Sequence, residues 1–113
     1  LTLTSTDLLS DSLSISVTDA LTITKAAELK RIVTSTTSSA IAVAASYTKA
    51  YVYLKNMSTT ANEIITIEKT DGGDEYFTLG AGEFAFFPWA SVVDLFADAA
   101  TGTPTLEVGI FEA

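Results

Sequence analysis

The feature that most constrains the fold is a series of short segments in which apolar and polar residues alternate, with turn residues between them. In residues 50–56, Val52 and Leu54 lie on one side of an extended chain and Tyr51, Tyr53 and Lys55 on the other. Alternation with a period of two indicates β-strands with one buried face. The same interpretation applies to residues 63–69, 75–79, 83–89, 92–97 and 105–111.

The segments between these runs contain residues that favour tight turns. Residues 71–74 read Asp-Gly-Gly-Asp and residues 80–82 read Gly-Ala-Gly. Glycine adopts positive φ without a Cβ penalty, so both segments predict a reversal of the chain between neighbouring strands. Pro88 cannot donate a hydrogen bond to a neighbouring strand, which predicts an edge strand or a strand end there.

The first half of the chain has weaker strand patterns and no aromatic residue before position 47. Residues 13–18 and 21–24 alternate apolar residues with Ser and Thr, and residues 38–46 are small and apolar. Residues 26–33 fit either a helix of about two turns or a bend that leads into a strand through Ile32 and Val33. We favour the strand, because no Gly or Asn stop signal follows.

These patterns predict an all-β protein, a jelly-roll-like β-sandwich of about eight short antiparallel strands. A chain of 113 residues is the size of one domain. We assign residues 11–113 to the sandwich and residues 1–10 to an extended N-terminal segment. The residues expected to point inward are Val52, Leu54, Ile65, Ile67, Leu79, Phe84, Phe86, Leu95, Leu106, Val108 and Ile110.

The extended N-terminal segment has too few apolar residues for a core of its own. These residues are Leu1, Leu3, Leu8 and Leu9, and the rest of the segment is rich in Ser and Thr. We expect the segment to dock along a neighbouring subunit or a sheet edge, where strand addition would satisfy its main-chain groups.

The charge of the chain disfavours two classes of partner. The formal net charge is -8, and all six basic residues lie between positions 25 and 69. Phosphate backbones and anionic membrane surfaces attract clustered Lys and Arg, so neither a nucleic acid nor a membrane is expected as a partner. No apolar run is long enough to span a bilayer. The opening Leu-Thr-Leu-Thr has no basic region or continuous apolar run, so no signal peptide is expected.

The chain lacks the usual residues of catalytic and metal sites, since it contains no His and no Cys. It also contains no nucleophile elbow, phosphate loop or dinucleotide fingerprint. The carboxylate cluster with ligand-like spacing is Asp71, Asp74 and Glu75. Calcium could use these oxygens, but Asp residues also favour turns by themselves. We interpret the cluster as a turn, and expect no enzyme activity, no metal and no cofactor.

The aromatic residues near the C-terminus leave two interpretations open. Phe84 and Phe86 share one face of their strand, while Phe87 and Trp89 share the other. Either the strand is buried on both faces, or Phe87 and Trp89 stay exposed and anchor a partner, as aromatic residues do at interface centres. Tyr51 and Tyr53 form either a stacking platform for sugars or an ordinary sheet surface.

Several sequence elements resemble small virion structural proteins of tailed bacteriophages. The elements are AYVYLKNMSTT, ITIEKTDGGDEYFTLGAGEFAFFPW and the terminal TLEVGIFEA, and the opening DSLSISVTDALTIT is similar as well. The L-x-x-GEF-x-x-x-P element comprises Leu79, Gly82, Glu83, Phe84 and Pro88. The resemblance implies a β-sandwich protein that decorates or cements a capsid. A location in the head–tail or tail region is the less favoured alternative. It brings no catalytic residues.

The leading hypothesis is therefore a capsid decoration protein, made in the host cytoplasm and located on the virion. Its expected partners are the major capsid protein and copies of itself, most plausibly as a trimer. The alternatives are a head–tail, tail or baseplate component, or a carbohydrate- or receptor-binding module. The residues assigned to the partner interface are Leu1, Leu3, Leu8, Leu9, Lys30, Arg31, Lys55, Phe87 and Trp89.

Overall fold

The chain folds into β-strands joined by turns. The computed structural model describes residues 2–5, 13–16, 18, 20, 22, 28–43, 48–69, 73–90 and 93–112, and none of these residues is helical. The strands are β1 (Thr2–Ser5), β2 (Leu13–Ser16), β3 (Glu28–Val33), β4 (Ser39–Ala42), β5 (Ala50–Asn56), β6 (Ile65–Glu68), β7 (Glu75–Leu79), β8 (Phe84–Trp89), β9 (Leu95–Ala99) and β10 (Thr105–Glu112). The all-β class is confirmed, as is a strand through Ile32 and Val33.

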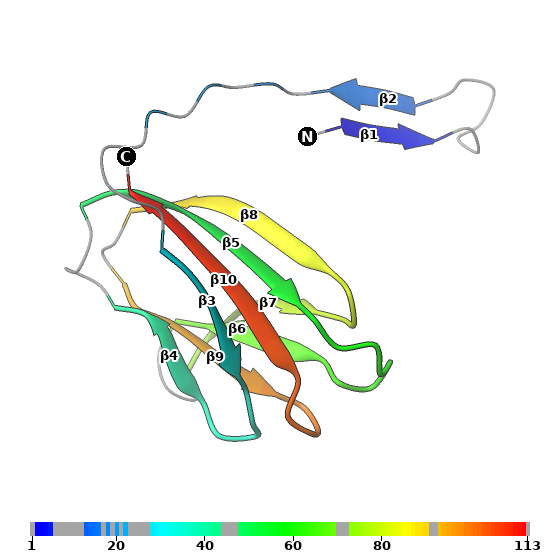
Figure 1. Cartoon of the computed structure of the whole chain (residues 1–113), viewed down its shortest axis with the longest axis vertical. Coiled ribbons are helices and arrows are strands. Elements are labelled where there is room, and N and C mark those ends of the chain that lie inside the picture. The colour runs from blue at the N-terminus through cyan, green and yellow to red at the C-terminus, as the bar shows by residue number, and fades with distance from the viewer. Residues whose placement is uncertain are drawn as a thin grey trace.

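Eight of the strands form two antiparallel four-stranded sheets, in the orders β3-β10-β5-β8 and β4-β9-β6-β7. Figure 1 shows the two sheets as the layers of a sandwich. The pairing is nested, because β3 pairs with β10, β4 with β9, β5 with β8 and β6 with β7. Most contacts are therefore made between segments far apart in the sequence.

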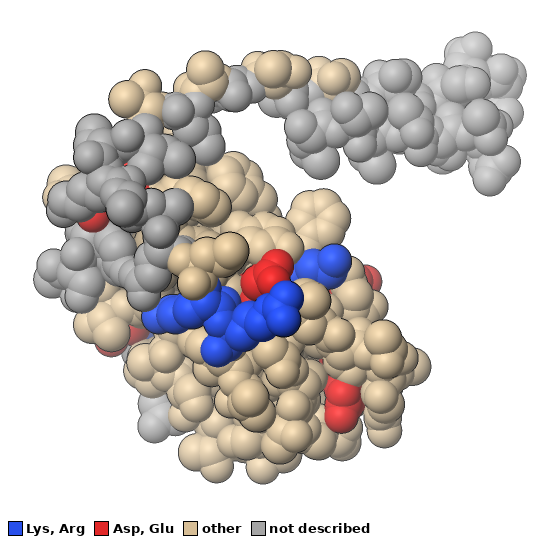
Figure 2. Space-filling view, in the orientation of Figure 1, with Lys and Arg blue, Asp and Glu red and all other residues tan. Residues whose placement is uncertain are grey.

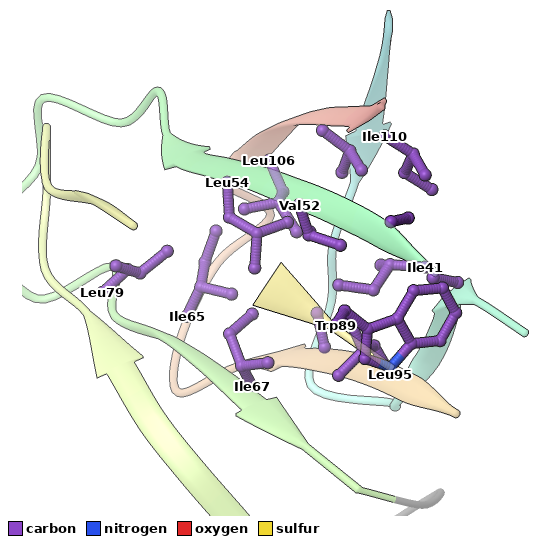
Figure 3. Close-up of a cluster of buried hydrophobic side chains, with 14 residues drawn as sticks. Ile41, Val52, Leu54, Ile65, Ile67, Leu79, Trp89, Leu95, Leu106 and Ile110 are labelled. Carbon is purple, nitrogen blue, oxygen red and sulfur yellow. The ribbon is translucent and has the colours of Figure 1, made fainter. Parts of the chain in front are cut away.

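The core lies between the two sheets, where both contribute aliphatic side chains (Figure 3). Val52 and Leu54 of β5 are fully buried, as are Ile65 and Ile67 of β6. Their alternation with half-buried neighbours is the period-two pattern expected from the sequence. The predicted inward positions are confirmed at Val52, Leu54, Ile65, Ile67, Leu79, Leu95, Leu106, Val108 and Ile110.

The expected orientation of β8 is wrong. Phe84 and Phe86 are 62% and 51% exposed, whereas Trp89 is 5% exposed and belongs to the core. The register with β5 explains the difference, because residues directly opposite each other in a ladder project on the same side. Phe87 lies opposite the buried Val52, while Phe86 lies opposite Tyr53 on the outer side.

A buried asparagine joins β5 to two loops. Asn56 is fully buried, and its Nδ2 donates to the carbonyl oxygens of Glu63 at 2.8 Å and Leu79 at 3.1 Å. Its Oδ1 accepts a hydrogen bond from the Ser58 amide at 3.0 Å. One side chain therefore holds the end of β5, the start of the following loop and the end of β7 together.

The first two strands form a separate two-stranded sheet. β1 pairs with β2 in an antiparallel register in which Leu3 lies opposite Ile15. Figure 1 draws this hairpin apart from the two larger sheets. The expected division of the chain at residue 10 remains a prediction, and the β1–β2 pairing crosses it.

Candidate functional site

The outer side of the β3-β10-β5-β8 sheet carries a group of exposed apolar side chains. The cross-strand register places Tyr53 between Gly109 and Phe86, and Tyr51 between Phe111 and Pro88. Leu29 on β3 lies opposite Gly109 and is 67% exposed. We call this surface the aromatic face, and it consists of Leu29, Tyr51, Tyr53, Phe84, Phe86 and Phe111.

The rings of the aromatic face contact one another across three strands. Tyr51 and Phe86 are stacked, with ring centroids 5.9 Å apart and planes inclined by 7°, and Phe86 lies 6.5 Å from Phe111. Gly109 leaves space below the Phe111 ring, since a Cβ there would come within 3.1 Å of Phe111 Cε2. Lys49 Nζ lies 5.9 Å from the Tyr51 ring centroid. These contacts hold the rings over the sheet as a continuous apolar surface.

A polar cluster borders the aromatic face. The Tyr53 hydroxyl donates to Glu107 Oε1 at 3.1 Å, and Arg31 Nε donates to Glu107 Oε2 at 3.2 Å. Burial, followed by the hydrogen bond and charge of Glu107, raises the pKa of Tyr53 above 10.0. The Arg31–Glu107 ion pair is largely exposed on the arginine side and so contributes little to stability. Its effect is to fix the orientation of the charges beside the rings.

The structure brings together two of the three basic residues that were assigned to the partner interface. Arg31, Glu107 and Lys55 lie in one cross-strand row, with the carboxylate in the middle. Figure 2 shows Lys and Arg side chains gathered around an acidic group on this side of the molecule. Lys30 lies opposite the inward-facing Val108 and is half-buried, so it belongs to the other side of the edge strand β3.

The expected exposure of Phe87 and Trp89 is wrong. Phe87 is half-buried and packs edge-on against Phe77, with ring centroids 5.8 Å apart. Trp89 is in the core, and its Nε1 donates to the Val93 carbonyl oxygen at 3.1 Å. The exposed aromatic residues of β8 are instead Phe84 and Phe86. The alternation of the two pairs along β8 is visible in the sequence. The sequence alone does not show which of the two pairs points outward.

The N-terminal interface prediction lies mostly outside the described residues. Leu1, Leu8 and Leu9 are not among them, and Leu3 is described only as part of the backbone of β1. Asp71 of the carboxylate cluster also lies outside them, while Asp74 and Glu75 are exposed. Within the described residues, no three carboxylates are grouped closely enough to hold a metal ion.

A polar hollow lies at the end of the sandwich where the β5–β6 loop meets the segment before β10. It is lined by Arg31, Ser58, Glu63 and Pro104, among others. The Ser58 hydroxyl donates to the Glu63 carboxylate, and Asn56 holds the Glu63 carbonyl oxygen. Because these polar groups bind atoms of the β5–β6 loop, we interpret them as groups that stabilise the loop. The absence of enzyme activity stays a prediction.

The outer side of the second sheet has a different character. Asp98 of β9 lies opposite Thr66 of β6, and the negative charges of Glu68 and Glu75 act on it. Burial, followed by these two charges, raises the pKa of Asp98 above 3.8, although a hydrogen bond with Thr66 opposes the rise. Acidic groups therefore gather on the sheet opposite the aromatic face.

We expect the substitution Asp98→Asn to stabilise the protein at pH 7 by up to about 1 kcal/mol, the usual scale for partly exposed charges. A carboxyl group with a raised pKa destabilises the folded state at high pH. That cost disappears as the pH falls through the folded pKa toward the ordinary value. Urea unfolding between pH 4 and 7 should show the advantage of the variant shrinking at lower pH. An advantage that does not change with pH would contradict this assignment.

No protein-family model, curated protein or solved structure matches this chain. In the part of the chain that the structure describes, no helix is long and apolar enough to cross a membrane.

Proposed function

We propose that this chain is a structural protein of a bacteriophage virion, which decorates the head by binding the major capsid protein through the aromatic face. The observation that carries the proposal is the exposure of Leu29, Phe84 and Phe86 on one side of a single sheet. A contiguous exposed apolar patch rimmed by polar residues is typical of a protein–protein contact site. Aromatic residues and Arg are also the residues enriched at interface centres.

The architecture supports a virion role. Nested pairing of eight strands in two sheets is the arrangement expected when a long antiparallel ribbon winds into a jelly roll. Jelly rolls are found in viral capsid proteins and also in lectins. The sequence resemblance to small virion structural proteins of tailed bacteriophages favours the first of these two classes.

The distribution of charge supports one orientation of the subunit on a capsid. Arg31 and Lys55 border the aromatic face, whereas acidic groups gather on the opposite sheet. We propose that the aromatic face meets the capsid and that the acidic sheet faces the solvent, which would keep the decorated particle soluble. The subunit would associate with itself, most plausibly as a trimer, and would need no nucleic acid, membrane or cofactor.

Phe86→Ala is expected to weaken binding to empty shells assembled from the major capsid protein of the phage that encodes this chain. The loss should reach about 2 kcal/mol, because Phe86 contacts both Tyr51 and Phe111 at the centre of the aromatic face. Sedimentation of labelled protein with the shells would measure it. The unfolding free energy should change by no more than about 1 kcal/mol, since the ring is half exposed.

Val43→Ala provides the matched control, because Val43 is 50% exposed and lies outside the aromatic face. It should bind the shells as tightly as the unaltered protein. Equal binding by Phe86→Ala would remove the aromatic face from the capsid contact. A reconstruction that places the protein at the head–tail junction or in the tail would favour the other virion role.

A carbohydrate-binding module is the second candidate, and one observation favours it. The rings of Tyr51 and Phe86 are stacked, and Tyr53, which lies opposite Phe86, donates to Glu107, so flat aromatic surfaces and hydrogen-bonding groups occur on the same face. Glycan-array binding that is abolished by Tyr51→Ala would support this role. Binding to shells without any glycan signal would favour the capsid role.

A further inference from the structure

The strand β8 lies at one edge of the β3-β10-β5-β8 sheet, and its outer side has no neighbouring strand among the described residues. β8 pairs with β5 on one side only, and it ends the β3-β10-β5-β8 sheet. Its sequence, FAFFPW, contains no charged residue. Exposed apolar edges promote association, and proteins usually protect them with charged residues, proline or a covering segment. Pro88 is the one such residue within the strand, and no other described strand pairs with this side of β8.

An apolar groove runs beside this edge, between β8 and the edge strand β7 of the other sheet. We call it the edge groove, and it is lined by Tyr76, Phe77, Phe87, Pro88, Trp89 and Leu95. Tyr76 on its rim is 46% exposed. A strand added to β8 would place alternate side chains over this groove, because successive side chains of a strand point to opposite faces.

The chain itself contains a segment with the matching pattern. The β1–β2 hairpin pairs only with itself among the described strands, and an isolated two-stranded hairpin is at best marginally stable in water. Its second strand reads Leu-Ser-Ile-Ser, with apolar residues at alternate positions. Residues 1–24 carry acidic but no basic residues, and β8 carries no acidic residue that would repel them. The apolar pattern of the hairpin therefore matches the groove, and charge on β8 does not oppose the contact.

We propose that the β1–β2 hairpin of one copy adds to the open edge of β8 in a second copy and covers the edge groove. Main-chain hydrogen bonds to β8 would provide affinity, and the alternating side chains would provide register. This contact deepens the self-association included in the proposed function, and it does not depend on capsid binding.

The length of the connection permits exchange between copies. The eleven residues 17–27 between β2 and β3 can span at most roughly 36 Å when fully extended. A four-stranded sheet is only about 15 Å wide between its outer strands. The contact joins two different surfaces, so it generates a closed ring when the rotation between copies allows it. A trimer is one such ring.

The first test is the oligomeric state of the full chain in solution, measured as its molecular mass by sedimentation equilibrium. We expect the unaltered protein to associate and Ile15→Lys and Tyr76→Lys each to weaken association at least about tenfold. Ile15→Lys changes the hairpin and Tyr76→Lys changes the rim of the edge groove. Val43→Lys is the control, since Val43 is 50% exposed, lies outside the aromatic face and follows β4, at the opposite edge of its sheet from β7.

The second test identifies the two surfaces directly, and it uses the absence of Cys from the chain. Ile15→Cys protein is mixed with Phe84→Cys protein and treated with a short bismaleimide, with Val43→Cys replacing Phe84→Cys in the control. Preferential cross-linking of Ile15→Cys to Phe84→Cys protein supports the proposal. Circular dichroism on each variant establishes that the sandwich is retained.

The remaining outcomes separate the possible failures. A monomeric unaltered protein would overturn the proposed self-association and this contact with it. An oligomer with no preference for the Phe84→Cys partner would overturn this contact alone. A chain that carries both Ile15→Cys and Phe84→Cys tests for contact within one copy. Cross-linking in that chain, without cross-linking between the two single variants, would show that the hairpin covers its own β8 and would overturn exchange between copies.

Discussion

Trp89→Ala is expected to lower the free energy of unfolding by about 3–5 kcal/mol, the usual range for removing a buried aromatic ring. Trp89 is 5% exposed and packs in the core between the two sheets. The substitution would leave a cavity and would also remove the donor to the Val93 carbonyl oxygen. Because a domain of this kind is stabilised by only about 5–15 kcal/mol, the effect would be a large share of the total.

Circular dichroism during urea unfolding should measure this loss, since Trp89 is the only tryptophan and its fluorescence disappears with it. Phe86→Ala is the matched control on the same strand, because Phe86 is 51% exposed and should cost about 1 kcal/mol or less. A loss below about 1 kcal/mol for Trp89→Ala would place the indole at the surface. It would also restore Trp89 as a candidate partner contact.

Asn56→Asp is expected to cost on the order of 3 kcal/mol or more at pH 7. The amide nitrogen that donates to the carbonyl oxygens of Glu63 and Leu79 would be replaced by a carboxylate oxygen, which cannot donate. Each buried polar group left without a partner costs about 1–3 kcal/mol. The site is fully buried, so a negative charge there would also lose its hydration without gaining a cation.

The pH dependence provides a specific check on this mechanism. Burial and the facing carbonyl oxygens would raise the pKa of the new carboxyl group, and its protonated form can donate one hydrogen bond. The destabilisation should therefore shrink as the pH is lowered from 7 toward 4. Asn62→Ala, at an exposed position in the following loop, should change stability by less than about 0.5 kcal/mol. A loss at Asn56 that is equal at both pH values would contradict the role of its amide donor.

The strand positions could be predicted because they depend on local pattern. The interpretation of residues 50–56 as a strand with Val52 and Leu54 inward is confirmed, as is that of residues 75–79. β-Branched and aromatic residues alternating with polar residues give a pleated chain one buried face in almost any sandwich. The turn at residues 80–82 followed from glycine, and Gly82 has a φ of 76°.

The candidate site was less predictable, because it is assembled from four strands. The charge of Arg31 and Lys55 marks them as interface candidates in the sequence, but their relation to Glu107 depends on two pairings between distant segments. Leu29 and Phe111 had no local feature that marked them as surface residues. The role of Asn56 had no local signal either, since its partners lie in the following loop and at the end of β7, and their positions follow from the packing of the sheets.

By itself the sequence determined that the chain forms strands, where they begin and end to within a few residues, and most of the aliphatic side chains that fill the core. Ile41, which is also buried, was not among those expected to point inward. It did not determine which face of β8 is buried. The segment FAFFPW has bulky apolar residues on both faces, so its own periodicity is compatible with either orientation. The pairing of β8 with β5 decided the matter, because Val52 and Leu54 already faced the core and Phe87 and Ala85 lie opposite them. That register, set by contacts between distant segments, buries Trp89 and leaves Phe84 and Phe86 exposed on the aromatic face.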